Sequence, residues 1–91
     1  MSLAWLYQVI LDRQTNLPPD SYTARLFQAG LGRIAQKVGE EATETVVAAL
    51  AEDEARLIGE IADLTYHVLV LMAARGISLA AVEAELERRH R

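Results

Sequence analysis

Two long stretches with helical apolar spacing, joined by a very short turn, constrain this sequence more than any other feature. Apolar residues recur every three or four positions over residues 33–51 and again over residues 54–75, which predicts an amphipathic helix in each. A turn of about two residues brings consecutive helices back alongside each other, so we expect an antiparallel pair. The expected apolar faces are Ile34, Val38, Ala42, Val46 and Ala49, and Leu57, Ile61, Leu64, Val68, Leu71 and Met72.

Three shorter helices are predicted around this hairpin. The first runs from Leu3 to Thr15 and ends before the paired prolines at 18 and 19, which remove backbone donors. A short second helix follows the prolines, and a last helix ends near Arg89. The residues expected to cap or end these helices and the long ones are Asp20 or Ser21, Gly30, Gly32, Asp53, Gly76 and Ser78.

Composition favours one small globular domain. The 91 residues are 52% apolar and 24% charged, which excludes a disordered chain. The absence of cysteine excludes a disulfide scaffold, a thiolate metal site and a cysteine nucleophile. The sequence therefore predicts a single all-α domain over residues 1–91, built as an antiparallel long-helix hairpin with short flanking helices.

Two further features concern location. The longest apolar run, residues 68–74, is much shorter than the ~20 residues that span a bilayer. No basic-then-apolar leader opens the chain. We therefore expect a cytoplasmic protein that does not bind a membrane.

Charge is concentrated in the middle of the sequence. The whole chain carries −4, which argues against a nucleic-acid partner, because proteins that bind the phosphate backbone usually carry a basic excess. Residues 40–63 hold eight acids and the single base Arg56, a net charge of −7, whereas the rest of the chain is +3. The acidic stretch spans the end of the first long helix and the start of the second.

Four of these acids form two pairs. Glu41 and Glu44, and likewise Glu60 and Asp63, stand three residues apart, so each pair shares a helix face. Antiparallel pairing places both pairs at similar heights from the turn. Four converging carboxylates repel one another unless a cation lies among them, and hard oxygen ligands suit Mg²⁺ or Mn²⁺. The alternative is a solvated acidic face, and the spacing alone leaves both interpretations open.

His67 is less informative. It follows Asp63 by four residues, and it fits a metal ligand, a substrate contact or a histidine satisfied by a backbone carbonyl. The spacing departs from the Glu-x-x-His pattern of di-iron bundles. The sequence contains no glycine-rich phosphate loop.

The acidic motif also carries a resemblance. Glu41-x-x-Glu44 followed by Glu60-x-x-Asp63 resembles the signature of the MazG-like all-α nucleotide pyrophosphohydrolases. Residues 21–27 (SYTARLF), 37–45 (KVGEEATET) and 62–67 (ADLTYH) resemble the phosphoribosyl-ATP pyrophosphohydrolase family of histidine biosynthesis, over nearly the whole chain. The resemblance implies hydrolysis of phosphoribosyl-ATP to phosphoribosyl-AMP and pyrophosphate. A hydrolase of other nucleoside triphosphates and a non-enzymatic helical assembly module are the alternatives.

The resemblance also implies roles for individual residues. The metal ligands would be Glu41, Glu44, Glu60 and Asp63, binding Mg²⁺ or Mn²⁺ in its place. Glu40 would be an auxiliary ligand or the base that accepts the proton of the attacking water. Lys37 would contact phosphate. The candidates for the substrate's ribose 5-phosphate are Arg13, Arg25 and Arg33, of which we favour Arg13 and Arg33, and Ser21, Thr23 and His67 are further substrate candidates, with capping an equal alternative for Ser21 and Thr23.

The apolar surface of the hairpin predicts a second subunit. The second long helix carries another apolar flank, at Ile58, Ala62, Leu69 and Met72, beside its main stripe. One antiparallel partner helix covers only a narrow seam. We therefore expect a homodimer in which two hairpins form a four-helix bundle, with each acidic site near the subunit boundary.

Overall fold

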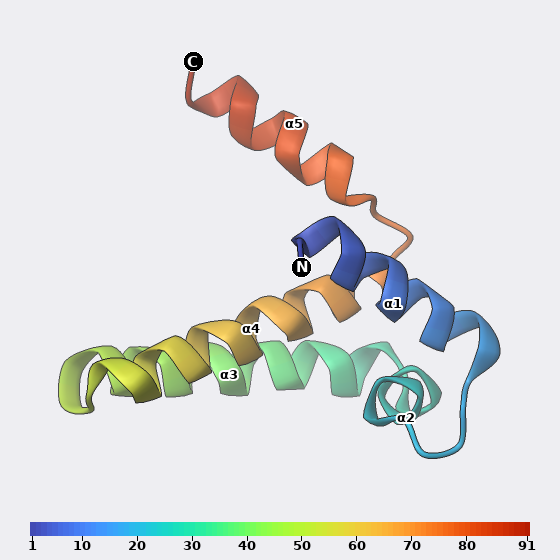
Figure 1. The fold of residues 1–91 in the computed structure, drawn as a ribbon, viewed down its shortest axis with the longest axis horizontal. Coiled ribbons are helices and arrows are strands. Elements are labelled where there is room, and N and C mark those ends of the chain that lie inside the picture. Colours follow the sequence, from blue (N-terminus) through green and yellow to red (C-terminus); the bar gives the residue numbers. More distant parts are fainter.

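A computed structural model describes residues 1–91, and it contains five helices and no strand (Figure 1). The prediction of an all-α fold built on a long-helix hairpin is confirmed. The long helices are each 21 residues and are joined through Glu52 and Asp53. The elements are α1 (Leu3–Asn16), α2 (Tyr22–Ala29), α3 (Leu31–Ala51), α4 (Glu54–Ala74) and α5 (Leu79–Arg89).

Local sequence signals set the helix ends. Ser21, Asp53 and Ser78 each accept a hydrogen bond from a backbone N–H three residues later, so these three predicted caps are confirmed. Gly76 lies in the left-handed region at φ 66° and ends α4, as expected. The predicted break at 30–32 is shorter than expected. Gly30 alone, at φ 100°, separates α2 from α3, and Gly32 is helical.

The core lies at the open end of the hairpin, where α3 begins at Leu31 and α4 ends at Ala74. There α1 and α2 pack against α3 and the C-terminal half of α4 (Figure 1). The Tyr7 hydroxyl donates a hydrogen bond to the Ile77 carbonyl, which ties α1 to the segment after α4. The buried cluster comprises Tyr7, Ile10, Leu26, Ile34, Leu69, Val70, Met72 and Ala73.

The closed end of the hairpin, next to the Glu52–Asp53 link, is not covered by another helix. Several residues predicted for the apolar faces are exposed in the single chain: Val46 and Ala49 on α3, and Ile61 and Val68 on α4. The sequence predicted an apolar face at these positions and a second subunit to cover its surplus, and in the single chain α1 and α2 cover only part of that face. The radius of gyration, 14.1 Å, exceeds the about 12 Å expected of a compact chain of this length.

Helices α5 and α4 differ in how many of their residues are buried. No residue of α5 is buried, and this helix extends away from the hairpin (Figure 1). α4 is long and apolar enough to cross a membrane by length and composition alone. Its C-terminal half, however, supplies half of the buried cluster, and its N-terminal half carries Glu60 and Asp63. α4 thus contributes both to the core and to the acidic segment.

The open-end core generates a stability prediction. Ile10 is 1% exposed and lies within the buried cluster. We expect Ile10→Ala to lower the free energy of unfolding by about 2–5 kcal/mol, through lost burial and the cavity left behind. Gln8→Ala, at an exposed position of the same helix, is the control and should change it by less than about 0.5 kcal/mol. Urea titrations at one protein concentration measure both, and equal effects would contradict this placement of the core.

Candidate active site

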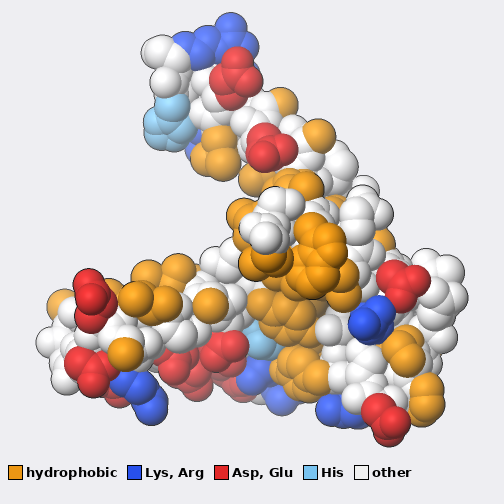
Figure 2. Space-filling model, in the orientation of Figure 1, with side chains coloured by type: hydrophobic (Ala, Val, Ile, Leu, Met, Phe, Trp, Pro, Cys, Tyr) orange, Lys and Arg blue, Asp and Glu red, His pale blue; other side chains and the backbone are white.

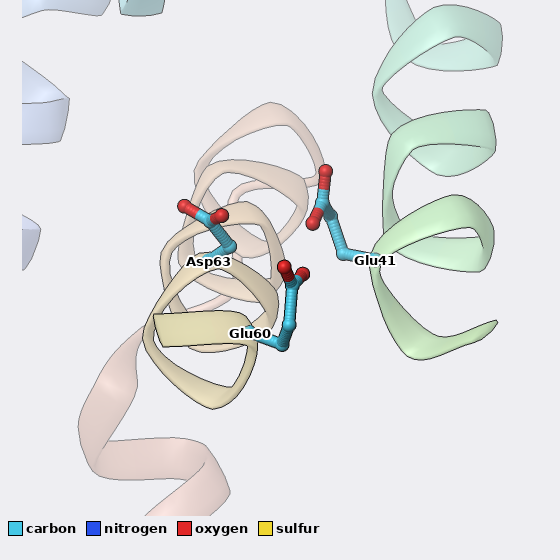
Figure 3. Close-up of side chains that lie close together, drawn as sticks. All are labelled: Glu41, Glu60 and Asp63. Carbon is cyan, nitrogen blue, oxygen red and sulfur yellow. The ribbon is translucent and has the colours of Figure 1, made fainter. Parts of the chain in front are cut away.

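Three carboxylates from the two long helices meet between them. Glu41 of α3 faces Glu60 and Asp63 of α4 (Figure 3), and one oxygen of each lies within 4.8 Å of the others. Glu41 is 5% exposed, Glu60 is partly buried, and Asp63 opens toward solvent. The structure therefore brings together three of the four predicted metal ligands, which we call the acidic trio.

The acidic trio is electrostatically incomplete. Oε2 of Glu41 and Oε2 of Glu60 are buried and have no hydrogen-bond partner. A buried charged oxygen without a partner is costly, and neighbouring carboxylates add mutual repulsion. A divalent cation would satisfy these oxygens and remove the repulsion. The donor set, oxygens with one side open to solvent, fits Mg²⁺ or Mn²⁺.

Close contact between the helices holds the trio together. The Thr45 hydroxyl lies 2.8 Å from the Glu41 carbonyl oxygen of its own helix and 3.2 Å from the Glu60 carbonyl oxygen across the hairpin. Ala48, one turn further along α3, is 1% exposed. A small side chain at this position permits the close approach, so the two-residue turn and these contacts together set the register of the acids.

Basic residues line the α3 edge of the trio. Lys37 Nζ lies 3.2 Å from Glu41 and 3.9 Å from Glu40, and Arg33 lies 3.5 Å from Glu40. Burial acts to lower the pKa of Lys37, but the hydrogen bond to Glu41 and the charges of nearby acids outweigh it, so the pKa is raised. Lys37 is therefore a fixed positive charge beside the trio. Glu40 lies outside the trio and contacts both Arg33 and Lys37, which it holds beside the trio.

Glu44, the fourth predicted ligand, lies apart from the trio. It is exposed, and with Glu60 it lines a neighbouring cavity of about 320 Å³ toward the closed end of the hairpin. Arg56 lines the same cavity and contacts Glu52. Glu60 is thus shared between the trio and the cavity that Glu44 faces.

His67 belongs to a polar network that joins α2 to α4. Its Nδ1 lies 2.7 Å from the Asp63 carbonyl oxygen, which can only accept, so Nδ1 carries a proton. In the neutral imidazole, Nε2 then accepts from the Tyr22 hydroxyl at 3.1 Å. His67 is 4% exposed and has both ring nitrogens engaged. This geometry matches the backbone-satisfied histidine that was one of the three sequence interpretations.

The remaining predicted substrate residues occupy two places. Ser21 caps α2, and the Thr23 hydroxyl bonds to the Tyr66 hydroxyl across the α2–α4 contact. Arg13 contacts Asp12 at 2.8 Å and lines a polar surface cavity with Ser21. Sequence reasoning missed Tyr22 and Tyr66 as site neighbours. Their contacts join positions more than 40 residues apart, and no periodicity records such a pairing.

Comparison with known proteins shows what the chain is similar to. The model of the family described as phosphoribosyl-ATP pyrophosphohydrolase matches residues 3–90. A protein named phosphoribosyl-ATP pyrophosphatase from Pyrobaculum calidifontis is 60% identical over 84 residues, covering 92% of this chain and 89% of the relative. Relatives of the same name are 52% identical in Saccharolobus islandicus, over 94% of this chain and 92% of the relative, and 58% identical in Paramagnetospirillum magneticum, over 92% and 77%.

The strain in the trio is testable without substrate. Glu60→Gln keeps the side-chain shape and removes one of the repelling charges. In EDTA, we expect its free energy of unfolding to hold or rise, because the lost charge had a buried oxygen without a partner. Glu44→Gln is the matched control and should change it by less than about 0.5 kcal/mol, since Glu44 is exposed. Loss of more than about 1 kcal/mol in Glu60→Gln alone would mean that the Glu60 charge is already compensated.

Proposed function

The chain belongs to the phosphoribosyl-ATP pyrophosphohydrolase family, and from this membership and the acidic trio we propose that it hydrolyses phosphoribosyl-ATP to phosphoribosyl-AMP and pyrophosphate. It is accordingly a hydrolase of histidine biosynthesis, and we propose a cytoplasmic location. The observation that carries the chemistry is the pair of buried carboxylate oxygens without partners, between two helices.

The acidic trio fits this reaction only together with cations. A triphosphate would be repelled by three carboxylates, so we propose that Glu41, Glu60 and Asp63 hold Mg²⁺, or Mn²⁺ in its place, with Glu44 completing the ligand set from the adjoining cavity. When bound, such ions neutralise phosphate charge and lower the pKa of a bound water. The protein's part is to fix the ligand oxygens on two rigid helices.

The α3 edge supplies the charges that face the phosphates. Lys37 is one turn from Glu41 and fully protonated near neutral pH, so it can contact a phosphate oxygen as a point charge. Glu40 holds Lys37 and Arg33 in place. Both carboxylate oxygens of Glu40 are engaged, Oε1 by Arg33 and Gln36 and Oε2 by Lys37. We therefore propose an auxiliary, positioning role for Glu40 over the role of general base.

A pyrophosphate-release assay tests this function. We expect Mg²⁺-dependent release from phosphoribosyl-ATP and much slower release from ATP measured in parallel. Glu60→Gln should lose at least about 100-fold in rate, because even outer-shell partners of metal ligands cost about 10–100-fold when they are removed. Glu87→Gln, an exposed change on α5, should match the parent. Equal rates on ATP would instead support a general nucleoside triphosphate hydrolase, and no release from either nucleotide would contradict enzymatic function.

Metal binding should also stabilise the fold. A ligand that binds only the folded state adds about 2.7 kcal/mol at 100 times its Kd. For a domain of this size, we expect Mg²⁺ or Mn²⁺ to raise Tm by about 10–20 °C under those conditions. NaCl at matched ionic strength, and Mg²⁺ added to Glu60→Gln, should raise Tm far less. Equal shifts from both salts would indicate screening of the acidic segment rather than a site.

The uncovered closed end of the hairpin supports a homodimer. Leu50 is 83% exposed, Ile58 61% and Val46 58%, and hydrophobic side chains lie along one face of the hairpin (Figure 2). A pair of helices such as α3 and α4 buries too little apolar surface to be stable alone. We propose that two hairpins pair around a two-fold axis into a four-helix bundle, which covers these side chains and lies close to the acidic trio.

Concentration dependence tests the dimer. We expect sedimentation at micromolar concentration to give twice 10.0 kDa and Tm to rise with protein concentration. Ile58→Glu should produce monomers, whereas Leu31→Glu, an exposed leucine at the open end of the hairpin, should leave the dimer intact. A stable, folded parent monomer of 10.0 kDa would contradict the proposal.

A further inference from the structure

Arg25 is the one basic residue of α1, α2 and α3 that has no acidic partner. Arg13 pairs with Asp12, while Arg33 and Lys37 pair with acids of α3. The guanidinium carbon of Arg25 instead lies 5.9 Å from the centre of the Tyr22 ring, within the range of a cation–π contact. The side chain is exposed. Arg25 therefore presents an uncompensated, oriented guanidinium to solvent.

The Tyr22 ring that carries Arg25 is fixed to the active site. Its hydroxyl bonds to His67, which in turn bonds to the backbone carbonyl of Asp63. The ring also lies 6.3 Å from that of Tyr66. Through these contacts α2 is attached to α4 one turn from a member of the acidic trio. Arg25 thus stands at a defined position at the α2 end of the site.

The proposed substrate carries phosphate at both ends. Its triphosphate and its second phosphate, on the added ribose, are separated by two riboses and a purine. With the triphosphate at the acidic trio, the second phosphate lies two riboses and a purine away, and the hairpin offers two directions for it. Toward the closed end the chain presents more acids, Glu44, Glu52 and Glu54. Toward α2 the acidic side chains give way to Lys and Arg side chains (Figure 2).

Resting on the proposed function, we propose that Arg25, held on the Tyr22 ring, binds the phosphate of the substrate's added ribose and so selects phosphoribosyl-ATP over ATP. A guanidinium offers two parallel N–H donors that match two phosphate oxygens. Arg13 and Arg33, favoured on sequence alone, are held by Asp12 and Glu40 and would have to leave a carboxylate first. The Tyr22 ring makes no such competing demand, because a ring 5.9 Å from the guanidinium carbon offers no carboxylate oxygen to its N–H donors.

Direct binding of two nucleotides tests the assignment. Phosphoribosyl-AMP carries the second phosphate and AMP lacks it, so their ratio of Kd values by calorimetry in Mg²⁺ reports recognition of that phosphate. We expect Arg25→Met to raise the Kd of phosphoribosyl-AMP by about 10–100-fold, the effect of losing a charged hydrogen-bond pair. The Kd of AMP should stay within about twofold of the parent value. Arg25→Lys, which keeps the charge but loses the paired donors, should fall between.

Two comparisons make the result decisive. Arg75→Met removes the same charge from the end of α4, where Arg75 has no acidic partner, and should leave both Kd values unchanged. Tyr22→Leu removes the supporting ring. It should raise the Kd of phosphoribosyl-AMP more than that of AMP, as Arg25→Met does. An unchanged Kd ratio in Arg25→Met, or an equal loss for both nucleotides, would overturn the assignment of Arg25. A parent protein that releases no pyrophosphate from phosphoribosyl-ATP would instead overturn the proposed function.

Discussion

The contact between α3 and α4 at Glu41 and Glu60 fixes how the two long helices face each other. A link of only Glu52 and Asp53 leaves the two long helices little freedom to slide. Thr45 and Ala48 then bring their backbones close together. In that register the acids of one helix must face those of the other. The fold therefore places like charges where an ordinary helix pair would place apolar residues.

Because of that arrangement, a cation bound at the acidic trio would contribute to the stability of the fold. Within the chain, Lys37 is the cation that directly contacts the trio, and it meets only one oxygen of Glu41. The second oxygens of Glu41 and Glu60 stay buried without partners. Burying these two oxygens without partners is unfavourable, so binding of a divalent cation that contacts them is favoured. A site with this electrostatic deficit is suited to a polyphosphate substrate that arrives with its own divalent cations.

Sequence reasoning predicted local features better than contacts between distant segments. The caps at Ser21, Asp53 and Ser78 follow from side-chain oxygens next to helical stretches, and the facing of Glu41 and Glu60 follows from turn length. The Tyr22–His67 bond joins separate helices, so no spacing in the sequence encodes it. Apolar periodicity placed Val46 and Ile61 on an apolar face, but it does not say which part of that face stays exposed in the single chain.

Anomalous X-ray scattering from crystals grown with Mn²⁺ would locate a cation held by the acidic trio. We expect a manganese peak between α3 and α4, bonded to carboxylate oxygens of Glu41, Glu60 and Asp63. The same crystals of Glu60→Gln should show that peak weakened or absent. At saturating Mn²⁺, a parent structure with no peak among these three carboxylates, and with Lys37 still bound to Glu41, would contradict a cation site in the trio.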